Sequence, residues 1–282
     1  MTVLLDGDAF AAIHRARTKA RADTIGFAPG MRPCLATILV GQDPASLAYV
    51  ARKHGDCDEL GFKSLQIVLP VTATQADVLA QVARLGADPS VHGLLVQFPL
   101  PPHIDQWAVQ CAIDPAKDVD GLHPLNLGRM IAGRPGLRPC TPQGIVALLR
   151  YHGVPLAGAR VAIVGRGMLV GRPLATMLAD PAIDAVPTLL HRGAGDLAGI
   201  LRASDVIVSA AGQPDLVRAD MVRPGACVVG VGIRYVDGGM VSDIAEDVAA
   251  VAGWVTPRHG SIGPMTRAML MSNLLDAALA SA

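Results

Sequence analysis

Three glycines in the second half of the chain have the spacing of a dinucleotide-binding turn. They are Gly165, Gly167 and Gly171, in the pattern G-x-G-x-x-x-G between an apolar strand-like run and a helical one. Glycines at such a junction permit a tight turn and a close approach of the backbone to a pyrophosphate, whose charge the helix N-terminus stabilises. The motif therefore predicts a nicotinamide dinucleotide site, although an ordinary strand-to-helix turn could carry the same glycines.

The residues after the next strand-like run favour NADP over NAD as the cofactor. In a unit of this kind an acid at the end of the second strand, about 20 residues after the glycines, usually binds the ribose 2′-hydroxyl. Here the run ends in His191 and Arg192, and Arg166 lies within the glycine turn. Two cations without an acid suit a 2′-phosphate, so NADP is predicted. The alternative for Arg192 is a solvated loop arginine.

A second group of candidate residues lies in the first half of the chain. Tyr49 and Lys53 are four residues apart, so a helix would place them on one face. Alone they are most simply explained as a surface pair in which the lysine stem lies on the ring. Gln97 lies in an apolar run and needs hydrogen-bond partners, which a loop could supply. Asp118 and Asp120 could be turn acids or helix caps as well as ligand-binding groups.

Apolar periodicity predicts the elements that must position these residues. The first half alternates helices at 8–25, 45–60 and 75–88 with strands at 33–41, 63–70 and 91–103, and an irregular connection is predicted at 112–144. The rest predicts helices at 144–153 and 265–280, a strand, turn and helix at 159–180, and strands at 186–191, 205–212, 226–233 and 253–257. Strands separated by helices predict an α/β fold with a mostly parallel sheet and a site beyond the carboxyl ends of its strands.

Composition narrows the class of protein. The 282 residues are 51% hydrophobic and 17% charged, which argues against disorder, and the formal net charge of +0 argues against a polybasic nucleic-acid binder. Only 3% are aromatic, so RNA binding by stacking is not expected. Five scattered cysteines without a CxxC pair predict neither a disulfide scaffold nor a metal site, and a reducing compartment fits them. Without an apolar run long enough for a membrane span, a cytoplasmic protein is expected.

Six segments together resemble the bifunctional methylenetetrahydrofolate dehydrogenase/methenyltetrahydrofolate cyclohydrolase family. The resemblance runs in order from about residue 40 to the C-terminus. Its segments are Tyr49–Val50–x–x–Lys53, GLLVQFPLP at 93–101, PAKDVDGLHPLNLGR at 115–129, PCTPQG at 139–144, VGRGMLVGRP at 164–173 and GPMTRAMLMSN at 263–273.

The resemblance implies two α/β domains and a homodimer. A folate-binding catalytic domain of residues 1–138 would be completed by the C-terminal helix 265–282, and residues 139–264 would form a Rossmann-like NADP-binding domain. The implied substrates are one-carbon derivatives of tetrahydrofolate: 5,10-methylenetetrahydrofolate is oxidised to the methenyl form, which is hydrolysed to 10-formyltetrahydrofolate. That hydrolysis needs water activation and proton transfer, which a partly buried lysine could supply.

The resemblance also assigns roles to individual residues. Lys53 would be the catalytic lysine, Gln97 its partner, Tyr49 a platform that stacks on the folate, and Asp120 the anchor of the pterin ring. The remaining substrate-binding candidates are Val96, Phe98, Gly260, Ile262, Gly263 and Pro264. The cofactor-binding candidates are Gly165, Arg166, Gly167, Gly171, His191, Arg192, Ile233 and Thr266.

Four departures from the family pattern surround the predicted cofactor site and cleft rim. Gly167 replaces a serine, residues 191–194 read H-R-G-A where the family has H-S-x-T, and Gly230 replaces an acid. The loop before the last helix reads H-G-S-I-G-P-M-T at 259–266, where the family has P-G-G-V-G-P-M-T. Two alternatives follow: a divergent paralogue with one activity or with binding alone, and an NAD(P)-dependent dehydrogenase of another small substrate.

Overall fold

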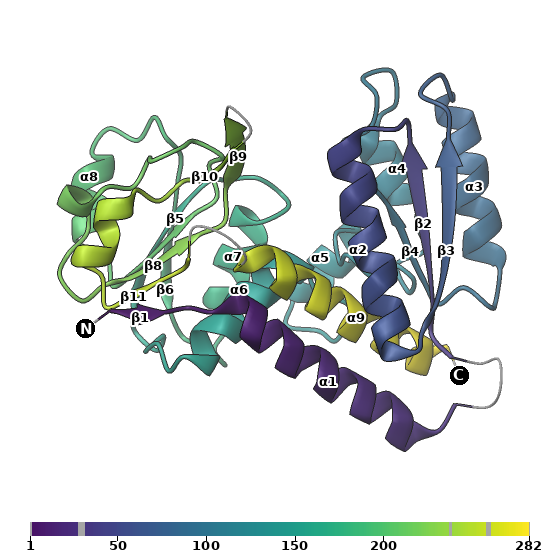
Figure 1. Cartoon of the computed structure of the whole chain (residues 1–282), viewed down its shortest axis with the longest axis horizontal. Helices are drawn as coiled ribbons and strands as arrows, with labels where there is room; N and C mark the ends of the chain where they lie inside the picture. Colours follow the sequence, from purple (N-terminus) through teal and green to yellow (C-terminus); the bar gives the residue numbers. More distant parts are fainter. Residues whose placement is uncertain (1, 28–31, 237–238, 258–260, 282) are drawn as a thin grey trace. The chain divides into compact units, whose positions relative to one another are not determined.

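The computed structural model describes residues 2–27, 32–236, 239–257 and 261–281. The chain divides into two compact units, which are drawn in Figure 1. The three-stranded unit comprises Ala12–Cys140 and Arg267–Ala282, and the six-stranded unit comprises Met1–Ala11 and Thr141–Thr266, so far as these are described. The division falls within the first and last helices, α1 (Gly7–Ile25) and α9 (Ile262–Ala280).

A parallel sheet forms the centre of the three-stranded unit. Its strands β2 (Cys34–Val40), β3 (Lys63–Leu69) and β4 (Gly93–Val96) lie in the order β3-β2-β4. In register, Ile38 of β2 pairs with Ile67 on one side and Val96 on the other. Every side chain of β2 is buried, which is the pattern of a central parallel strand covered on both faces. The helices of this unit are α2 (Pro44–Leu60), α3 (Gln75–Ala87), α4 (Gln106–Ala112) and α5 (Pro124–Ile131), with parts of α1 and α9.

Helices cover the two faces of this sheet. On one face, Ala36, Ile38 and Val40 of β2 form a core with Val78, Val82 and Leu85 of α3 and Val109 of α4. On the other face lies α2, drawn on the opposite side of the strands from α3 in Figure 1. The His54 ring nitrogens lie 2.9 Å from Thr37 Oγ1 and 2.8 Å from Ser64 Oγ, and burial lowers the pKa of His54. A neutral imidazole therefore attaches α2 to both β2 and β3.

The six-stranded unit contains a second parallel sheet with nucleotide-binding topology. Its order is β1-β11-β8-β7-β5-β6. Because β5 (Arg160–Val164) pairs with β6 (Val186–Leu190) on one side and with β7 (Val206–Ser209) on the other, the chain changes direction across the sheet at β5. In open α/β sheets, the crevice at such a switch point binds ligands. The other strands are β1 (Val3–Leu4), β8 (Cys227–Gly230) and β11 (Trp254–Val255).

Helices and a hairpin complete the six-stranded unit. Its apolar core joins Ala162 and Val164 of β5 to Ile207, Leu201 and Val248 of the elements around them. The sheet is accompanied by α6 (Cys140–Tyr151), α7 (Gly171–Leu178), α8 (Leu197–Arg202), the 3₁₀ helices η1 (Ala219–Met221) and η2 (Glu246–Ala250), and the antiparallel pair β9 (Ile233–Val236) and β10 (Gly239–Ser242).

The predicted fold class is confirmed, and several predicted elements need correction. The segment 112–144 is not wholly irregular, since α5 lies within it and α6 begins at Cys140. Pro124 at the first position of α5 and the His123 ring, which accepts a hydrogen bond from Leu125 N, are its start signals. The strand predicted at 91–103 ends at Val96, before the prolines. Apolar periodicity gave no prediction for β1, α4, α8 or the pairing of β9 with β10, because all of these elements are short.

Candidate functional site

The helix α2 carries Tyr49 and Lys53, and its start is encoded locally. Asp43 is the N-cap and accepts a hydrogen bond from Ser46 N at 2.8 Å, and Pro44 follows at the first helical position. Both features favour a helix beginning here. A stripe of buried residues then runs along one side of the helix: Ser46, Val50, Lys53, Asp56, Cys57 and Leu60. The face of α2 that turns inward thus contains two charged side chains.

Lys53 is a buried cation with few protein partners. It is 4% exposed, and its Nζ donates a hydrogen bond to Gln97 Oε1 at 3.2 Å and lies 4.8 Å from the centre of the Tyr49 ring. Within the described residues, no carboxylate forms an ion pair with it. Gln97 is itself held, because its Nε2 donates to Phe98 O at 2.7 Å. A surface pair is therefore the wrong interpretation of Tyr49 and Lys53, since the ammonium lies inside the unit with donors to spare.

Tyr49 is a hydrogen-bond donor at neutral pH. Burial raises the pKa of its hydroxyl, and the negative charge of the Asp120 carboxylate raises it further. The nearby Arg267 guanidinium opposes this rise in pKa without reversing it. The ring is half-buried, so it presents both an apolar face and a protonated hydroxyl. This combination suits a planar ligand with polar edges.

The two acids of KDVDG have different environments. Asp118 is 1% exposed, and its carboxylate accepts hydrogen bonds from Gln110 Nε2 at 3.1 Å, His123 N at 2.7 Å and Asn126 Nδ2 at 2.9 Å. It is therefore a turn acid. Asp120 is half-buried, and in the described part of the chain its carboxylate makes no hydrogen bond or ion pair. Of the two, Asp120 is the one with acceptor capacity left for a ligand.

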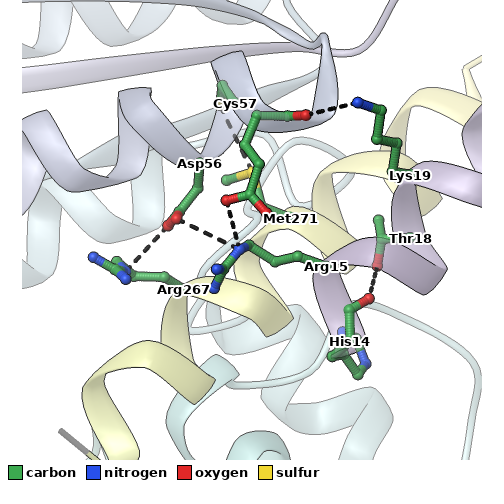
Figure 2. Close-up of polar contacts among 9 residues, drawn as sticks. His14, Arg15, Thr18, Lys19, Asp56, Cys57, Arg267 and Met271 are labelled. Carbon is green, nitrogen blue, oxygen red and sulfur yellow. Dashed lines mark hydrogen bonds and ion pairs between the residues drawn. The ribbon is translucent and has the colours of Figure 1, made fainter. Parts of the chain in front are cut away.

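A polar cluster fixes the position of α2 against the two terminal helices. Figure 2 shows Asp56 between Arg267 of α9 and Arg15 of α1, whose Nε atoms lie 3.1 and 3.8 Å from its oxygens. Arg15 also donates to Glu59 at 3.0 Å. Burial raises the pKa of Asp56, while the guanidinium of Arg267 opposes the rise. The cluster compensates a buried carboxylate three residues after Lys53, on the same face of the helix.

The glycine turn of the six-stranded unit has the steric features of a nucleotide-binding turn. Gly165 has φ 128°, and a Cβ there would lie 2.4 Å from Ala210 O. A Cβ on Gly171 would lie 1.7 Å from Gly165 O. Both positions therefore require glycine, whereas a Cβ on Gly167 would meet open space. Since α7 begins at Gly171 without a side-chain cap, its N-terminus can accept an anion, and the turn fits the pyrophosphate of NAD(P).

The predicted cations lie beside this turn on the surface. Arg166 and Arg192 are exposed, and neither forms an ion pair with another described residue. The exposed His191 ring accepts a hydrogen bond from Gly193 N at 3.1 Å, which shapes the loop after β6. Both guanidiniums are thus available to an anionic ligand.

The remaining predicted residues lie on several elements, and their functional roles are still predictions. Ile262 is buried, Gly263 and Pro264 are half-buried, and the hydroxyl of Thr266 lies 2.9 Å from that of Thr141. Ile233 begins β9, and Gly260 lies outside the described residues. Val96 is buried at the end of β4, and Phe98 packs on the core of the three-stranded unit.

Two residues at these sites, Asn273 and Asp243, were not predicted from the sequence. Asn273 of α9 donates from Nδ2 to Val119 O at 2.8 Å and to Arg138 O at 2.9 Å, and so fixes the segment that carries Asp120. Asp243 is a buried acid at the carboxyl end of the six-stranded sheet. An amide in an apolar helix and an acid after a strand were the only signals, and neither identifies a partner.

One departure from the family pattern has a packing counterpart. A Cβ on Gly230 would lie 2.7 Å from Ser242 Oγ and 2.9 Å from Ile244 Cγ1. Side chains of the neighbouring segment therefore occupy the space that an acid at this position would need.

In the described ranges there is no cluster of three or more metal-ligating side chains, and no helix is long and apolar enough to span a membrane.

A parallel sheet with a switch point and a glycine turn, together with a separate unit that buries a lysine, defines an α/β enzyme with an NAD(P)-binding domain. The family profile for "Tetrahydrofolate dehydrogenase/cyclohydrolase, catalytic domain" matches residues 5–120, and the profile for the "NAD(P)-binding domain" of the same family matches residues 139–282. The chain therefore belongs to the tetrahydrofolate dehydrogenase/cyclohydrolase family. Its activities are those of a methylenetetrahydrofolate dehydrogenase and methenyltetrahydrofolate cyclohydrolase.

Similarity to solved structures extends over almost the whole chain. The bifunctional enzyme FolD-methylenetetrahydrofolate dehydrogenase/cyclohydrolase from Campylobacter jejuni is 41% identical, with 99% of each chain covered and a TM-score of 0.95. The dehydrogenase-cyclohydrolase from Trypanosoma brucei, in complex with NADP and an inhibitor, is 38% identical, with 99% of this chain and 98% of that chain covered and a TM-score of 0.93. The NAD-dependent dehydrogenase from Saccharomyces cerevisiae is 21% identical, with 98% and 96% covered and a TM-score of 0.79, and shares the fold.

The Asp56–Arg267 pair is expected to behave as a buried ion pair. Asp56→Leu should lower the free energy of unfolding by up to about 3–5 kcal/mol, because it leaves Arg267, whose side chain is only 16% exposed, without this counter-charge. Adding Arg267→Leu should restore most of the loss. Denaturant unfolding measures both effects, with Arg21→Leu as the control that breaks an exposed pair between α1 and α9, at a cost of less than about 1 kcal/mol. If the losses of Asp56→Leu and Arg267→Leu simply add, the two side chains are not coupled.

Proposed function

We propose that this enzyme oxidises 5,10-methylenetetrahydrofolate with NADP and hydrolyses the methenyl product to 10-formyltetrahydrofolate at one site around Lys53. The observation that carries the proposal is the burial of the Lys53 ammonium against Gln97 and the Tyr49 ring, with no acidic partner in the part of the chain that the structure describes. A cation in this setting has hydrogen bonds left for a substrate. The half-buried Asp120 supplies the complementary acceptor.

Substrate binding would use the aromatic ring and the acid together. The folate would stack on Tyr49, and donors on its pterin ring would bind the Asp120 carboxylate. Val96 and Phe98 are next to Gln97 in the chain and are proposed to contact the folate. The other proposed substrate-binding residues are Gly260, Ile262, Gly263 and Pro264. In domain terms, residues 1–138 with 265–282 would bind the folate and residues 139–264 would bind NADP.

The dehydrogenase step would depend mainly on orientation. A nicotinamide cofactor held at the glycine turn would supply the hydride acceptor, and loss of a hydride from the one-carbon bridge would leave the folate as the methenyl cation. Holding two planar groups in the correct relative geometry is the contribution expected from the protein. Lys53 would contribute here by positioning the substrate, with Gln97 restricting the place of its Nζ.

Hydrolysis would use Lys53 for proton transfer. The oxygen of a water molecule bonds to the one-carbon bridge, the water gives up its protons, and the bond from the bridge carbon to the pterin nitrogen breaks. That nitrogen gains one proton and one proton is released, which balances the conversion of the methenyl cation to the formyl product. The Lys53 ammonium would give a proton to the pterin nitrogen and then take one from the water, so that it is protonated again at the end. The Gln97 oxygen would hold its Nζ in place.

NADP is proposed because of the cations beside the glycine turn. A 2′-phosphate can form charge-assisted bidentate hydrogen bonds with an arginine, whereas the 2′-hydroxyl of NAD offers that arginine no charged partner. The relative from Trypanosoma brucei is in complex with NADP, although the yeast relative is described as NAD-dependent. Gly165, Gly167 and Gly171 would hold the pyrophosphate. Arg166, His191, Arg192, Ile233 and Thr266 would complete the cofactor site. We further propose that the enzyme is a cytoplasmic homodimer.

Loss of the Lys53 amine should abolish hydrolysis selectively. Lys53→Met should slow hydrolysis of 5,10-methenyltetrahydrofolate by about 10²–10⁴-fold, the range typical of a general acid–base group, with the fold intact. The decay of the methenyl absorbance measures the rate, and circular dichroism checks the fold. Lys19→Met is the matched control, because Lys19 is exposed and its one hydrogen bond within the described residues goes to Glu59 O. Hydrolysis by Lys53→Met at the parent rate would show that the amine has no such role.

The two acids of KDVDG should separate binding from stability. Asp120→Ala should weaken folate binding about ten- to a hundredfold, the loss of one charge-assisted hydrogen bond, with little change in thermal stability. Asp118→Ala should instead lower the thermal midpoint, because it leaves buried donors without an acceptor. Calorimetric titration with tetrahydrofolate and thermal unfolding distinguish the two. Unchanged folate affinity with lost stability in Asp120→Ala would make Asp120 a turn acid too.

Cofactor choice tests the proposed dehydrogenase directly. The parent should form the methenyl chromophore from 5,10-methylenetetrahydrofolate with NADP in preference to NAD. Arg192→Ala should raise the Michaelis constant for NADP about ten- to a hundredfold and leave NAD nearly unchanged. The preference should shrink at high salt. Arg218→Ala, at another exposed arginine of the same unit, is the control. Turnover with neither cofactor contradicts the dehydrogenase, and a preference that survives Arg192→Ala contradicts the phosphate site.

A further inference from the structure

A single buried carboxylate oxygen organises the segment after β7. Asp243 is 1% exposed, and its Oδ2 accepts hydrogen bonds from Ser209 Oγ at 2.9 Å, Ala211 N at 2.8 Å and Gly212 N at 3.2 Å. All three donors belong to the end of β7 and the turn that follows it. Bonds from neutral donors to a charged oxygen are stronger than bonds between neutral groups, so this turn is pinned to the carboxylate.

The same carboxylate also lies against the turn after β8. A Cβ on Gly232 would lie 2.2 Å from Asp243 Oδ2, so only glycine fits there while the carboxylate keeps its place. Asp243 N donates to Gly232 O at 3.2 Å, and the backbone nitrogens of Val231 and Gly232 donate to Ser209 O at 2.8 and 3.2 Å. Asp243 therefore joins the turns that follow two neighbouring strands, at the carboxyl end of the sheet.

Backbone contacts extend this organisation to the glycine turn. Ala210 N donates to Val164 O at 2.7 Å. A Cβ on Gly165 would lie 2.4 Å from Ala210 O, so the two backbone segments are in close contact. Gly165 O in turn lies 1.7 Å from the place of a Cβ on Gly171. The turn held by Asp243 is thus packed directly against the turn proposed to hold the pyrophosphate. A shift of Ala210 would remove the backbone contact that positions Gly165.

The hydrogen bonds to Asp243 converge on one of its two oxygens. Three donors from the turn after β7 meet at Oδ2, while Oδ1 is buried without a hydrogen-bond partner among the described residues. A buried carboxylate is costly unless it is hydrogen-bonded, so the position of Oδ2 and that of the turn depend on each other. What the carboxylate achieves is a fixed geometry for two turns at the switch-point crevice between β5 and β7.

We propose that Asp243 is a positioning residue of the NAD(P) site, acting through the turns at Ser209–Gly212 and Val231–Gly232 on the glycine turn at Gly165. The proposal rests on the proposed function in so far as the crevice binds the cofactor. It concerns binding of the dinucleotide and leaves hydrolysis of the methenyl substrate unaffected, because hydrolysis uses no nicotinamide.

Direct binding separates this role from a structural one. Asp243→Ala should weaken NADPH binding, measured by calorimetric titration, by tenfold or more, while the rate of methenyl hydrolysis stays within about twofold of the parent. Asp205→Asn is the matched control, because Asp205 precedes β7 at the opposite end of the sheet and binds Arg160 and Arg223 there. It should leave NADPH affinity unchanged.

A second variant tests the geometry independently of the charge. Gly232→Ala should weaken NADPH binding to a similar degree, because its Cβ would displace the carboxylate. The double variant Gly232→Ala/Asp243→Ala should be no weaker than Asp243→Ala alone, since the two changes disturb the same contact.

Three outcomes overturn the inference. If the parent binds NADPH and both Asp243→Ala and Gly232→Ala bind it with the same affinity, the inference about Asp243 is wrong and the proposed function is unaffected. A fall of hydrolysis in parallel with NADPH affinity in both variants assigns Asp243 a general structural role. A parent that hydrolyses the methenyl substrate but binds neither NADPH nor NADP removes the proposed cofactor site and the inference with it.

Discussion

Holding the Lys53 ammonium inside the three-stranded unit is the constraint on which the proposed chemistry depends. An ammonium that leaves water loses strong hydration, and one hydrogen bond to Gln97 with a nearby aromatic ring replaces only part of it. The local structure must therefore prevent the side chain from turning outward. The N-cap at Asp43, the attachment of His54 to β2 and β3, and the Asp56 cluster all restrict the rotation of α2. The unmet hydrogen-bonding capacity of Lys53 is what makes the site receptive to a polar substrate.

The six-stranded unit meets a different requirement, the close approach of backbone to backbone. Gly165 and Gly171 leave no room for side chains, so the turn after β5 can pack on the end of β7. Gly167, one of the departures from the family pattern, carries no such steric requirement. A small residue other than glycine would fit there, so this departure leaves the geometry of the turn intact. Gly232, beside the buried carboxylate of Asp243, is a further position that cannot vary freely.

Charge is distributed differently in the two proposed sites. In the three-stranded unit, Asp118 is satisfied by internal donors and Asp56 is compensated by arginines, whereas the Asp120 carboxylate has no hydrogen-bond partner among the described residues. Beside the glycine turn, Arg166 and Arg192 are exposed and solvated. A buried pair changes its energy strongly when one partner is lost, whereas solvated cations attract an anion at a distance that salt can screen. The first arrangement suits orientation of a substrate, and the second suits selection of a charged cofactor.

Local sequence patterns determined the alternation of helices and strands, the glycine turn, and the shared helical face of Tyr49 and Lys53, because period and capping act within a few residues. They could not determine that Lys53 is buried or that it meets Gln97, 44 residues away, because such a contact depends on how α2 packs on the sheet. Nor could they separate Asp118 from Asp120, two acids in one turn. In the tertiary structure the Asp118 carboxylate accepts hydrogen bonds from internal donors, whereas the acceptors of Asp120 are unused among the described residues. Asp243 is the clearest case, since its partners come from turns that only the parallel sheet brings together.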